Sequence, residues 1–218
     1  MPEARTMPEA TTDVVVARAL LEAGTVTVRP DAPVTFKSGL HSPIYVDNRR
    51  LIFQPGPWHV VIEAFAAAVR DLATPAEVIA GVESAGIPHS SALAYVAGLP
   101  SVFVRKADRD HGLERRVEGG DVAGWHVVLV EDMVTTGGSS LSAVEALRAA
   151  GASVTSCLAI VSYGFAEATR AFADAAVTLT MLTSFETLIG EARAAGRIDD
   201  DAAAAIGAWL ADPRGWVA

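Results

Sequence analysis

Two adjacent carboxylates followed by a hydroxyl- and glycine-rich stretch form the part of the sequence with the clearest chemistry. Glu131 and Asp132 follow the apolar run Val127–Val130, and after them come Met133, Val134, Thr135, Thr136, Gly137, Gly138 and Ser139. A helix is predicted from Ser139, and the free backbone N–H groups and the dipole of a helix N-terminus favour an anion. Glycine allows close approach of the backbone, while the hydroxyl groups can donate hydrogen bonds. The segment therefore predicts a phosphate-binding loop beside an acidic pair.

A plain turn between a strand and a serine-capped helix is the alternative interpretation of this segment. That interpretation does not account for the paired carboxylates or for the run Thr-Thr-Gly-Gly-Ser at 135–139. No Gly-Lys-Ser or Gly-Lys-Thr follows, and the chain contains no Gly-x-Gly-x-x-Gly fingerprint. Walker-type nucleotide sites and dinucleotide sites are therefore disfavoured.

A basic segment, Arg105–Gly120, directly follows a predicted strand at 101–104. Five of the chain's 17 Lys and Arg side chains fall in it, at positions 105, 106, 109, 115 and 116. Only Leu113 and Val117 could anchor the segment, which predicts a mobile exposed loop. A solvated run of charges is the alternative, but the position at the end of a strand favours anion binding.

A third segment, Gly81–Pro88, also joins a strand to a helix. Its two glycines among small residues suit either a close approach of backbone amides to a diphosphate or an ordinary tight turn. The only lysines, Lys37 and Lys106, lie in segments that resemble motifs, whereas the rest of the chain uses arginine. Because a compact ammonium and a guanidinium are not interchangeable beside an anion, this usage hints at chemistry, although chance is a fair rival.

The elements that must position these segments alternate between strand and helix. Strands are predicted at 78–82, 101–104, 127–130, 154–161 and 177–180, and helices at 58–72, 87–97, 139–150, 165–173, from 185 and from 199. Short apolar strands separated by helices predict an α/β fold with a doubly wound, mostly parallel sheet. Ligands bind such sheets at the carboxyl ends of the strands, where all three segments lie.

The N-terminal part predicts a small hood on a single domain, 13–218. Residues 1–12 repeat Met-Pro-Glu-Ala and are expected to form a disordered tail. Asp13 is expected to cap a helix that stops at Gly24. Two brief strands between Val34 and Asp47 would flank a turn, which gives a hood from about 13–56 and a core from about 57–218.

Composition excludes several classes of function. The net charge of −9 argues against nucleic acid and anionic membranes as partners, because both require a basic face. No apolar stretch approaches the length of a membrane span. The lone Cys157 lies in an apolar run and is expected to be a buried, inert thiol, compatible with a reducing cytoplasm. No histidine pair has zinc-ligand spacing, and no catalytic triad can be assembled, so a hydrolase has no support.

Together these segments resemble the orotate phosphoribosyltransferases, members of the type I phosphoribosyltransferase fold, over about 13–216. The segment Val127–Ser140 is similar to the type I phosphoribosyl pyrophosphate motif, which by itself indicates only the superfamily. The orotate branch is indicated by Phe36–Arg49, with the sequence FKSGLHSPIYVDNR, in combination with the loop Arg105–Gly112. The resemblance implies an enzyme that joins orotate to the phosphoribosyl group in de novo pyrimidine biosynthesis.

The resemblance also implies which residues bind each part of the substrates. Lys37 and the Tyr45 region would contact orotate or the pyrophosphate side, and Thr135 would contact the orotate ring. Glu131 and Asp132 would hold the ribose hydroxyls, and the loop after them would wrap the 5-phosphate. The residues implied to bind phosphoribosyl pyrophosphate are Arg105, Lys106, Arg109, His111, Glu131, Asp132, Met133, Val134, Thr135, Thr136, Gly137, Gly138 and Ser139.

Catalysis would fall to Lys106, Arg109, His111 and Asp132. In the family the basic loop closes over the neighbouring subunit's site, so the resemblance implies that Arg105, Lys106, Arg109 and His111 bind pyrophosphate across a homodimer that shares the loop 105–120. Mg²⁺ would be the cofactor, held mainly by substrate oxygens and water rather than by a protein ligand cluster.

Two departures from the resemblance affect the site. Many relatives carry a lysine at the position of Arg109; an arginine keeps the charge but is a poor proton donor at neutral pH. Many relatives also carry an arginine that meets the orotate carboxylate after the strand at 154–161, where this chain reads Ser162–Glu167, although a subgroup with Tyr-Gly-Phe exists. Two rival functions remain: a purine phosphoribosyltransferase and a non-catalytic regulator that binds phosphoribosyl pyrophosphate.

Overall fold

A computed structural model describes residues 10–35, 39–106 and 116–217. It shows an α/β fold built on a six-stranded sheet in the order β10-β9-β8-β5-β6-β7. The strands are β5 (Val78–Val82), β6 (Ser101–Val104), β7 (Val117–Glu118), β8 (His126–Val134), β9 (Ser153–Ser162) and β10 (Thr178–Met181). Every pairing in this sheet is parallel except β6 with β7. The predicted doubly wound, mostly parallel sheet is confirmed.

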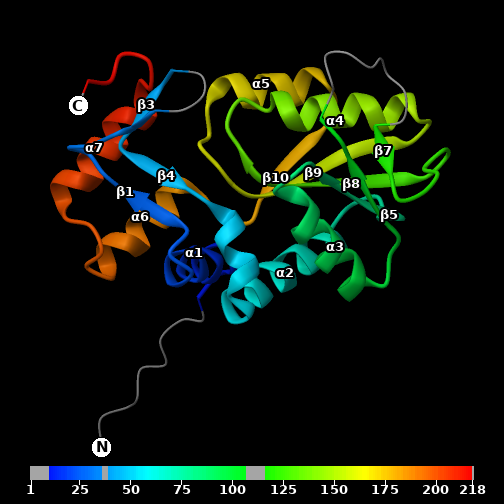
Figure 1. Cartoon of the computed structure of the whole chain (residues 1–218), viewed down its shortest axis with the longest axis horizontal. Coiled ribbons are helices and arrows are strands. Elements are labelled where there is room, and N and C mark those ends of the chain that lie inside the picture. The colour runs from blue at the N-terminus through cyan, green and yellow to red at the C-terminus, as the bar shows by residue number, and fades with distance from the viewer. Residues whose placement is uncertain (1–9, 36–38, 107–115, 218) are drawn as a thin grey trace, which may run out of the picture.

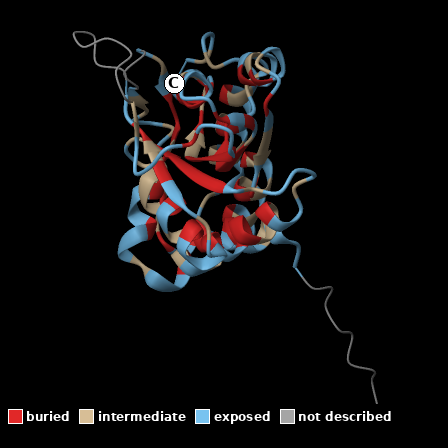
Figure 2. Cartoon of the chain, turned by 90° about the vertical axis from the view of Figure 1, so that its right-hand side faces the viewer, coloured by how far each residue is buried: buried red, intermediate tan, exposed pale blue. Residues whose placement is uncertain are grey.

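Helices cover both faces of the sheet (Figure 1). On one face lie α2 (Pro55–Arg70) and α3 (Gly86–Ala97), and on the other α4 (Gly138–Ala149) and α5 (Ala166–Asp174). A separate cluster of buried hydrophobic residues fills each side. The middle of β8, Val127–Val130, has no solvent exposure, because apolar side chains pack against it from both directions. Figure 2 shows buried residues running through the sheet.

The N-terminal part forms a hood of short elements beside the sheet. They are α1 (Thr12–Glu22), β1 (Val26–Val28), β2 (Val34–Thr35), β3 (His41–Ser42), β4 (Ile44–Val46) and the 3-10 helix η1 (Asn48–Phe53). Two strands were expected between Val34 and Asp47, and the structure has three there, β2, β3 and β4. They form two antiparallel pairs, β2 with β3 and β4 with the earlier strand β1. The hood therefore holds its shape by local strand pairing.

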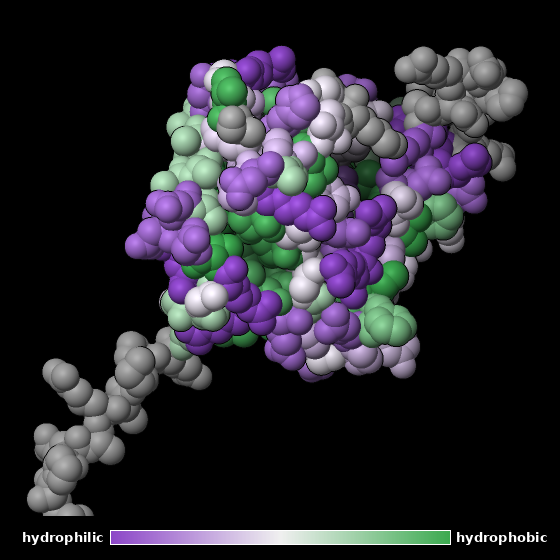
Figure 3. Space-filling model, turned by 60° about the vertical axis from the view of Figure 1, so that its left-hand side comes forward, coloured by the Kyte–Doolittle hydropathy of each residue, from purple (hydrophilic) through white to green (hydrophobic). Residues whose placement is uncertain are grey.

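The C-terminal helices α6 (Phe185–Ala194) and α7 (Asp200–Ala211) lie beside the hood (Figure 1). The indole Nε1 of Trp209 donates a hydrogen bond to the carbonyl of His41, 2.7 Å away. Arg18 on α1 pairs with Glu191 on α6, also at 2.7 Å. On this side of the molecule, hydrophobic residues are interspersed among hydrophilic ones (Figure 3). Helices α6 and α7 thus hold the hood in place through its first helix, α1, and its strand β3.

Several local predictions were wrong at element ends. Asp13 lies inside α1 rather than capping it, because the N-cap is Thr11 and the Asp13 carboxylate accepts bonds from the hydroxyls of Thr11 and Thr187. Thr12 is helical rather than part of a tail, while residues 1–9 lie outside the described ones. Strand β8 continues through the acidic pair to Val134, since β9 extends alongside it and keeps pairing. The antiparallel strand β7 was not predicted.

Candidate active site

The acidic pair lies near the C-terminal end of strand β8, at the carboxyl edge of the sheet. Glu131 is buried, with 6% exposure, and Asp132 is half-buried. The Ser140 hydroxyl donates to Glu131 Oε2 at 3.3 Å, and the backbone N–H of Asp132 donates to Glu131 Oε1 at 3.1 Å. Pairing with β9 holds both residues in extended backbone, so their carboxyl groups are fixed before any ligand arrives.

Helix α4 begins one residue earlier than expected, at Gly138. Gly137 precedes it with φ of 86°, and a Cβ there would lie 2.8 Å from the Phe172 ring. Only glycine suits both the left-handed backbone and this close approach. The start of α4, whose first backbone N–H groups have no partner within the helix, lines the pocket together with Thr135, Thr136 and Ser139. This is the arrangement that the sequence predicted for a phosphate group.

Helix α3 approaches the acidic pair just as closely. Gly86, its first residue, would place a Cβ 2.7 Å from the carbonyl oxygen of Val130 and 3.6 Å from Glu131 Oε1. A side chain at this position would push the helix away from strand β8. The segment Gly81–Pro88 is therefore a tight turn that also lines the pocket through Glu83, Ser84 and Ala85.

Gly86→Ala is expected to destabilise the protein by about 1–3 kcal/mol, because overpacking against backbone forces the helix to shift. The matched control is Gly207→Ala in α7, where a Cβ meets nothing within 4 Å and alanine should stabilise the helix by up to about 1 kcal/mol. Urea unfolding midpoints of both variants measure the difference. Equal or higher stability of Gly86→Ala would show that the approach of α3 to β8 is not tight.

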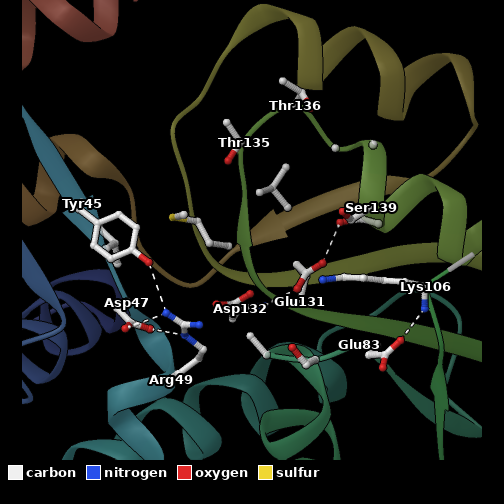
Figure 4. A pocket seen from close by; sticks show the side chains of 18 residues that line it. Tyr45, Asp47, Arg49, Glu83, Lys106, Glu131, Asp132, Thr135, Thr136 and Ser139 are labelled. Atoms are coloured by element: carbon white, nitrogen blue, oxygen red, sulfur yellow. Dashed lines mark hydrogen bonds and ion pairs between the residues drawn. The ribbon is translucent and has the colours of Figure 1, made fainter. Parts of the chain in front are cut away.

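These segments enclose a pocket of about 310 Å³ at the carboxyl ends of β5, β6 and β8 (Figure 4). Its residues come from the hood, from the turn after β5, from the end of β6 and from the whole acidic loop. The lining residues are Tyr45, Val46, Asp47, Arg49, Glu83, Ser84, Ala85, Lys106, Glu131, Asp132, Met133, Val134, Thr135, Thr136, Gly137, Gly138, Ser139 and Ser140. The three segments singled out in the sequence therefore meet at one place.

The structure brings together most of the predicted site residues. Tyr45, Lys106 and all nine residues of 131–139 line the pocket, whereas Arg105 does not. Arg105 pairs with Glu118 on β7, 3.3 Å away. The predicted residues Lys37, Arg109 and His111 lie outside the described residues.

Lys106 reaches the pocket from the end of strand β6. Its backbone N–H donates to Glu83 Oε2 at 2.6 Å, which ties the start of the basic loop to the turn after β5. Figure 4 shows its side chain on the opposite side of the acidic pair from Tyr45 and Arg49. The pocket that it lines is that of its own chain.

The hood adds residues to which sequence reasoning gave no role. Arg49 Nε and Nη2 donate to the two carboxylate oxygens of Asp47 at 2.6 and 2.9 Å. Asn48, fully buried, donates from Nδ2 to the backbone carbonyl of Asp132 at 2.9 Å. The sequence did point to this segment, since Asp47, Asn48 and Arg49 all lie within 36–49, but only the folded hood shows that they lie beside β8.

The carboxyl groups of the acidic pair have perturbed acidities. Burial raises the pKa of Glu131 well above its ordinary value of 4.5, and the negative charge of Asp132 raises it further. Burial also raises the pKa of Asp132, whereas the hydrogen bond from Glu131 and the charge of Arg49 oppose that shift. We therefore assign the retained proton to Glu131 and the negative charge to Asp132.

Glu131→Gln is expected to stabilise the protein increasingly as the pH rises. With a raised pKa in the folded state, Glu131 loses its proton more easily when unfolded, so the free energy of unfolding falls as the pH rises above about 4.5. Glutamine has no such loss, and the gain should reach about 1–3 kcal/mol near pH 8. Thermal melts of both proteins between pH 5 and 8 measure it.

The matched control for this prediction is Glu145→Gln, an exposed position on α4 outside the pocket. Its melting temperature should follow that of the wild type at every pH. A Glu131→Gln difference that shrinks with rising pH would contradict the raised pKa.

Neither a protein metal cluster nor a membrane span is found among the described residues. No group of three or more His, Cys, Asp or Glu side chains gathers there as a metal site. None of the described helices has both the length and the apolar character needed to cross a membrane. Cys157 is fully buried, as predicted, and burial raises its thiol pKa.

Comparison with known proteins gives a consistent result. The model of the phosphoribosyl transferase domain family matches residues 57–183. An orotate phosphoribosyltransferase of Lactiplantibacillus plantarum is 41% identical over 92% of this chain and 95% of its own length. The match thus includes the hood as well as the sheet.

Solved structures show the same similarity. Orotate phosphoribosyltransferase from Aeropyrum pernix superposes with a TM-score of 0.73 at 29% identity, covering 84% of this chain and 99% of that one. UMP synthase from Leishmania donovani has a TM-score of 0.80 at 27% identity, and the match covers 92% of this chain but 42% of that one. By sequence, fold and site, the chain belongs to the orotate phosphoribosyltransferase family, whose members transfer the phosphoribosyl group of phosphoribosyl pyrophosphate to orotate in pyrimidine biosynthesis.

Proposed function

We propose that the pocket holds phosphoribosyl pyrophosphate along the edge of the sheet. The 5-phosphate lies at the N-terminus of α4 within the loop 135–139, and the ribose hydroxyls lie against Glu131 and Asp132. The diphosphate extends toward Lys106. The observation that carries this assignment is the acidic pair between a helix N-terminus and a lysine in one pocket. Phosphoribosyl pyrophosphate has a phosphate at one end, a diphosphate at the other and hydroxyl groups between them. It therefore needs positive or N–H donor groups at both ends and carboxylates in the middle.

Orotate occupies the remaining wall of the pocket, which the hood provides. Tyr45 lies there, and Thr135 approaches from the loop after β8 (Figure 4). The predicted contact of Lys37 lies outside the described residues and stays part of the proposal. A ring bound here faces the anomeric carbon of a ribose held at Asp132, as a direct displacement requires.

The reaction proceeds by charge control. The ring nitrogen of orotate forms a bond to the anomeric carbon while the bond from that carbon to the diphosphate oxygen breaks. Positive charge builds on the ribose near Asp132, and negative charge builds on the leaving diphosphate near Lys106. Fixed groups of opposite sign stabilise both, and they need no rearrangement when the charge develops. Arg109 and His111 are proposed to add to the basic side.

We propose Mg²⁺ as the cofactor, bound with the diphosphate. The donor set fits an ion held mainly by substrate oxygens and water, because Asp132 is the charged member of its pair, Asp47 is already paired with Arg49, and Glu83 is the one further carboxylate among the described lining residues. When bound, magnesium would neutralise charge on the leaving diphosphate.

We propose a homodimer in which the loop 105–120 is shared between subunits. Large exposed hydrophobic side chains support an association, with Phe53 on η1 at 89% and Tyr95 on α3 at 88% exposure. Both elements contact helix α2. Lys106 lines its own chain's pocket, which leaves Arg109 and His111 as the residues proposed to act across the dimer. A cytoplasmic location is also proposed, in keeping with the single buried thiol.

The test offers purified protein with phosphoribosyl pyrophosphate and magnesium to orotate, uracil, adenine and hypoxanthine separately, and follows pyrophosphate release. Turnover with orotate alone is expected. Turnover with adenine or hypoxanthine would instead support the purine transferase. Binding of phosphoribosyl pyrophosphate without any turnover would support a regulator and contradict the enzyme.

A further inference from the structure

Apart from the proposed contact of Lys37, which lies outside the described residues, no role proposed so far supplies a positive charge at the base end of the pocket. Orotate carries a carboxylate, and a pocket that selects it must pair that group with a donor. Among the described lining residues the cations are Lys106 and Arg49. Lys106 lies across the acidic pair, at the diphosphate end, whereas Arg49 lies on the hood wall beside Tyr45 (Figure 4).

Arg49 is held in a fixed orientation by its neighbours. Asp47 accepts from Nε and Nη2, and Nη2 also donates to the Tyr45 hydroxyl at 3.3 Å. Within the described residues no hydrogen bond is recorded for Nη1, and 60% of the side chain is exposed. The guanidinium therefore presents unused N–H donors to the pocket from a position that needs no reordering.

The end of strand β9 supports this wall without supplying a cation. Tyr163 is buried there, and its ring stacks on Phe165 and Phe185 with centroids 5.5 and 4.5 Å away. Burial raises the pKa of the Tyr163 hydroxyl, and its electrostatic coupling to the Tyr45 phenol raises it further, so the two phenols lie near each other. Tyr163 and the aromatic residues packed against it therefore lie on the same side of the pocket as Tyr45, whose hydroxyl accepts a hydrogen bond from Arg49.

We propose that Arg49, oriented by Asp47 and Tyr45, binds the carboxylate of orotate and thereby selects orotate over uracil. This inference rests on the proposed placement of the base at the hood wall. Because Asp47 already balances the charge of Arg49, the selectivity comes from directed hydrogen bonds more than from net charge. Arg49 is thus a specificity residue, and its loss should affect the base end of the site much more than the phosphoribosyl end, which it reaches only through its charge beside Asp132.

The test compares two ligands that differ only in this carboxylate, orotidine 5′-phosphate and uridine 5′-phosphate. The affinity of each is measured by equilibrium titration for the wild type, Arg49→Gln and the control Arg50→Gln. Arg50 is the adjacent arginine; it is exposed and does not line the pocket, so it matches the charge change. Steady-state assays add the KM for orotate and for phosphoribosyl pyrophosphate.

Arg49→Gln is expected to weaken orotidine 5′-phosphate by roughly 10- to 100-fold and uridine 5′-phosphate by less than about 2-fold. The KM for orotate should rise much more than the KM for phosphoribosyl pyrophosphate. Arg50→Gln should behave as the wild type. A second variant, Asp47→Asn, keeps the Arg49 cation but removes the carboxylate that holds it by two hydrogen bonds. It should weaken orotidine 5′-phosphate in the same direction, by a smaller factor.

Two results would overturn the inference. Equal weakening of both nucleotides by Arg49→Gln would place Arg49 at the ribose or phosphate, and unchanged selectivity would exclude it from the carboxylate site. Failure of the proposed function is distinguishable from both, because a wild-type protein that does not turn over orotate fails before any variant is compared.

Discussion

Asp132→Asn is expected to lower kcat with orotate by about 10²- to 10³-fold, the range found when one preorganised charge-stabilising group is removed. Asp132 is the charged member of the acidic pair, and in the proposed placement of the substrate it faces the position where the ribose becomes positive. Asparagine keeps the size of the side chain but loses the charge. The backbone of Asp132 stays in place, because Asn48 holds its carbonyl group and β9 pairs with the strand.

Steady-state kinetics separate this role from binding. The KM for phosphoribosyl pyrophosphate should change much less than kcat, since an amide can still hydrogen-bond a ribose hydroxyl. Asp71→Asn, at an exposed position just after α2, is the matched control and should keep full activity. A variant with normal kcat and a high KM would show that Asp132 binds substrate without stabilising the transition state.

Lys106→Ala is expected to lower kcat by about 10²-fold or more, because in the proposed placement the ammonium group faces the diphosphate as it gains charge. Lys106→Arg should recover part of the loss, since the charge returns on a bulkier and differently shaped group. The structure also predicts where this lysine acts, because it lines the pocket of its own chain.

Mixing inactive variants distinguishes action within a subunit from action across the dimer. Lys106→Ala mixed with Asp132→Asn should stay inactive, because each site in the mixed dimer lacks one group. Arg109→Ala mixed with Asp132→Asn should regain about one quarter of wild-type activity, since half of the dimers then contain one intact site. Pyrophosphate release after subunit exchange measures both mixtures.

The opposite pattern would contradict these assignments. Recovery with Lys106→Ala would mean that this lysine acts across the interface. Absence of recovery with Arg109→Ala, in a preparation shown by sedimentation to be dimeric, would mean that the basic loop closes on its own subunit.

The sequence alone was sufficient for the sheet and for the main part of the pocket. Apolar runs of strand length and intervening helical periodicity predicted β5, β6 and β8 within a few residues. Parallel strands end at one edge, so the segments after them had to meet, which placed Lys106 beside Glu131 and the loop 135–139. These are consequences of local pattern and sheet geometry, and they do not depend on the details of packing.

Tertiary structure alone decided the hood wall and the acidities. Asn48 and Asp132 are 84 residues apart in the chain, and no periodicity predicts that one holds the carbonyl of the other. Burial raises the pKa of Glu131, and burial is a property of the packed molecule. The position of Arg49 depends on how η1 docks against β8. The sequence therefore determined which groups meet at the sheet edge, whereas contacts between distant segments decided which proton stays, how Arg49 is held in the hood wall, and where the pocket ends.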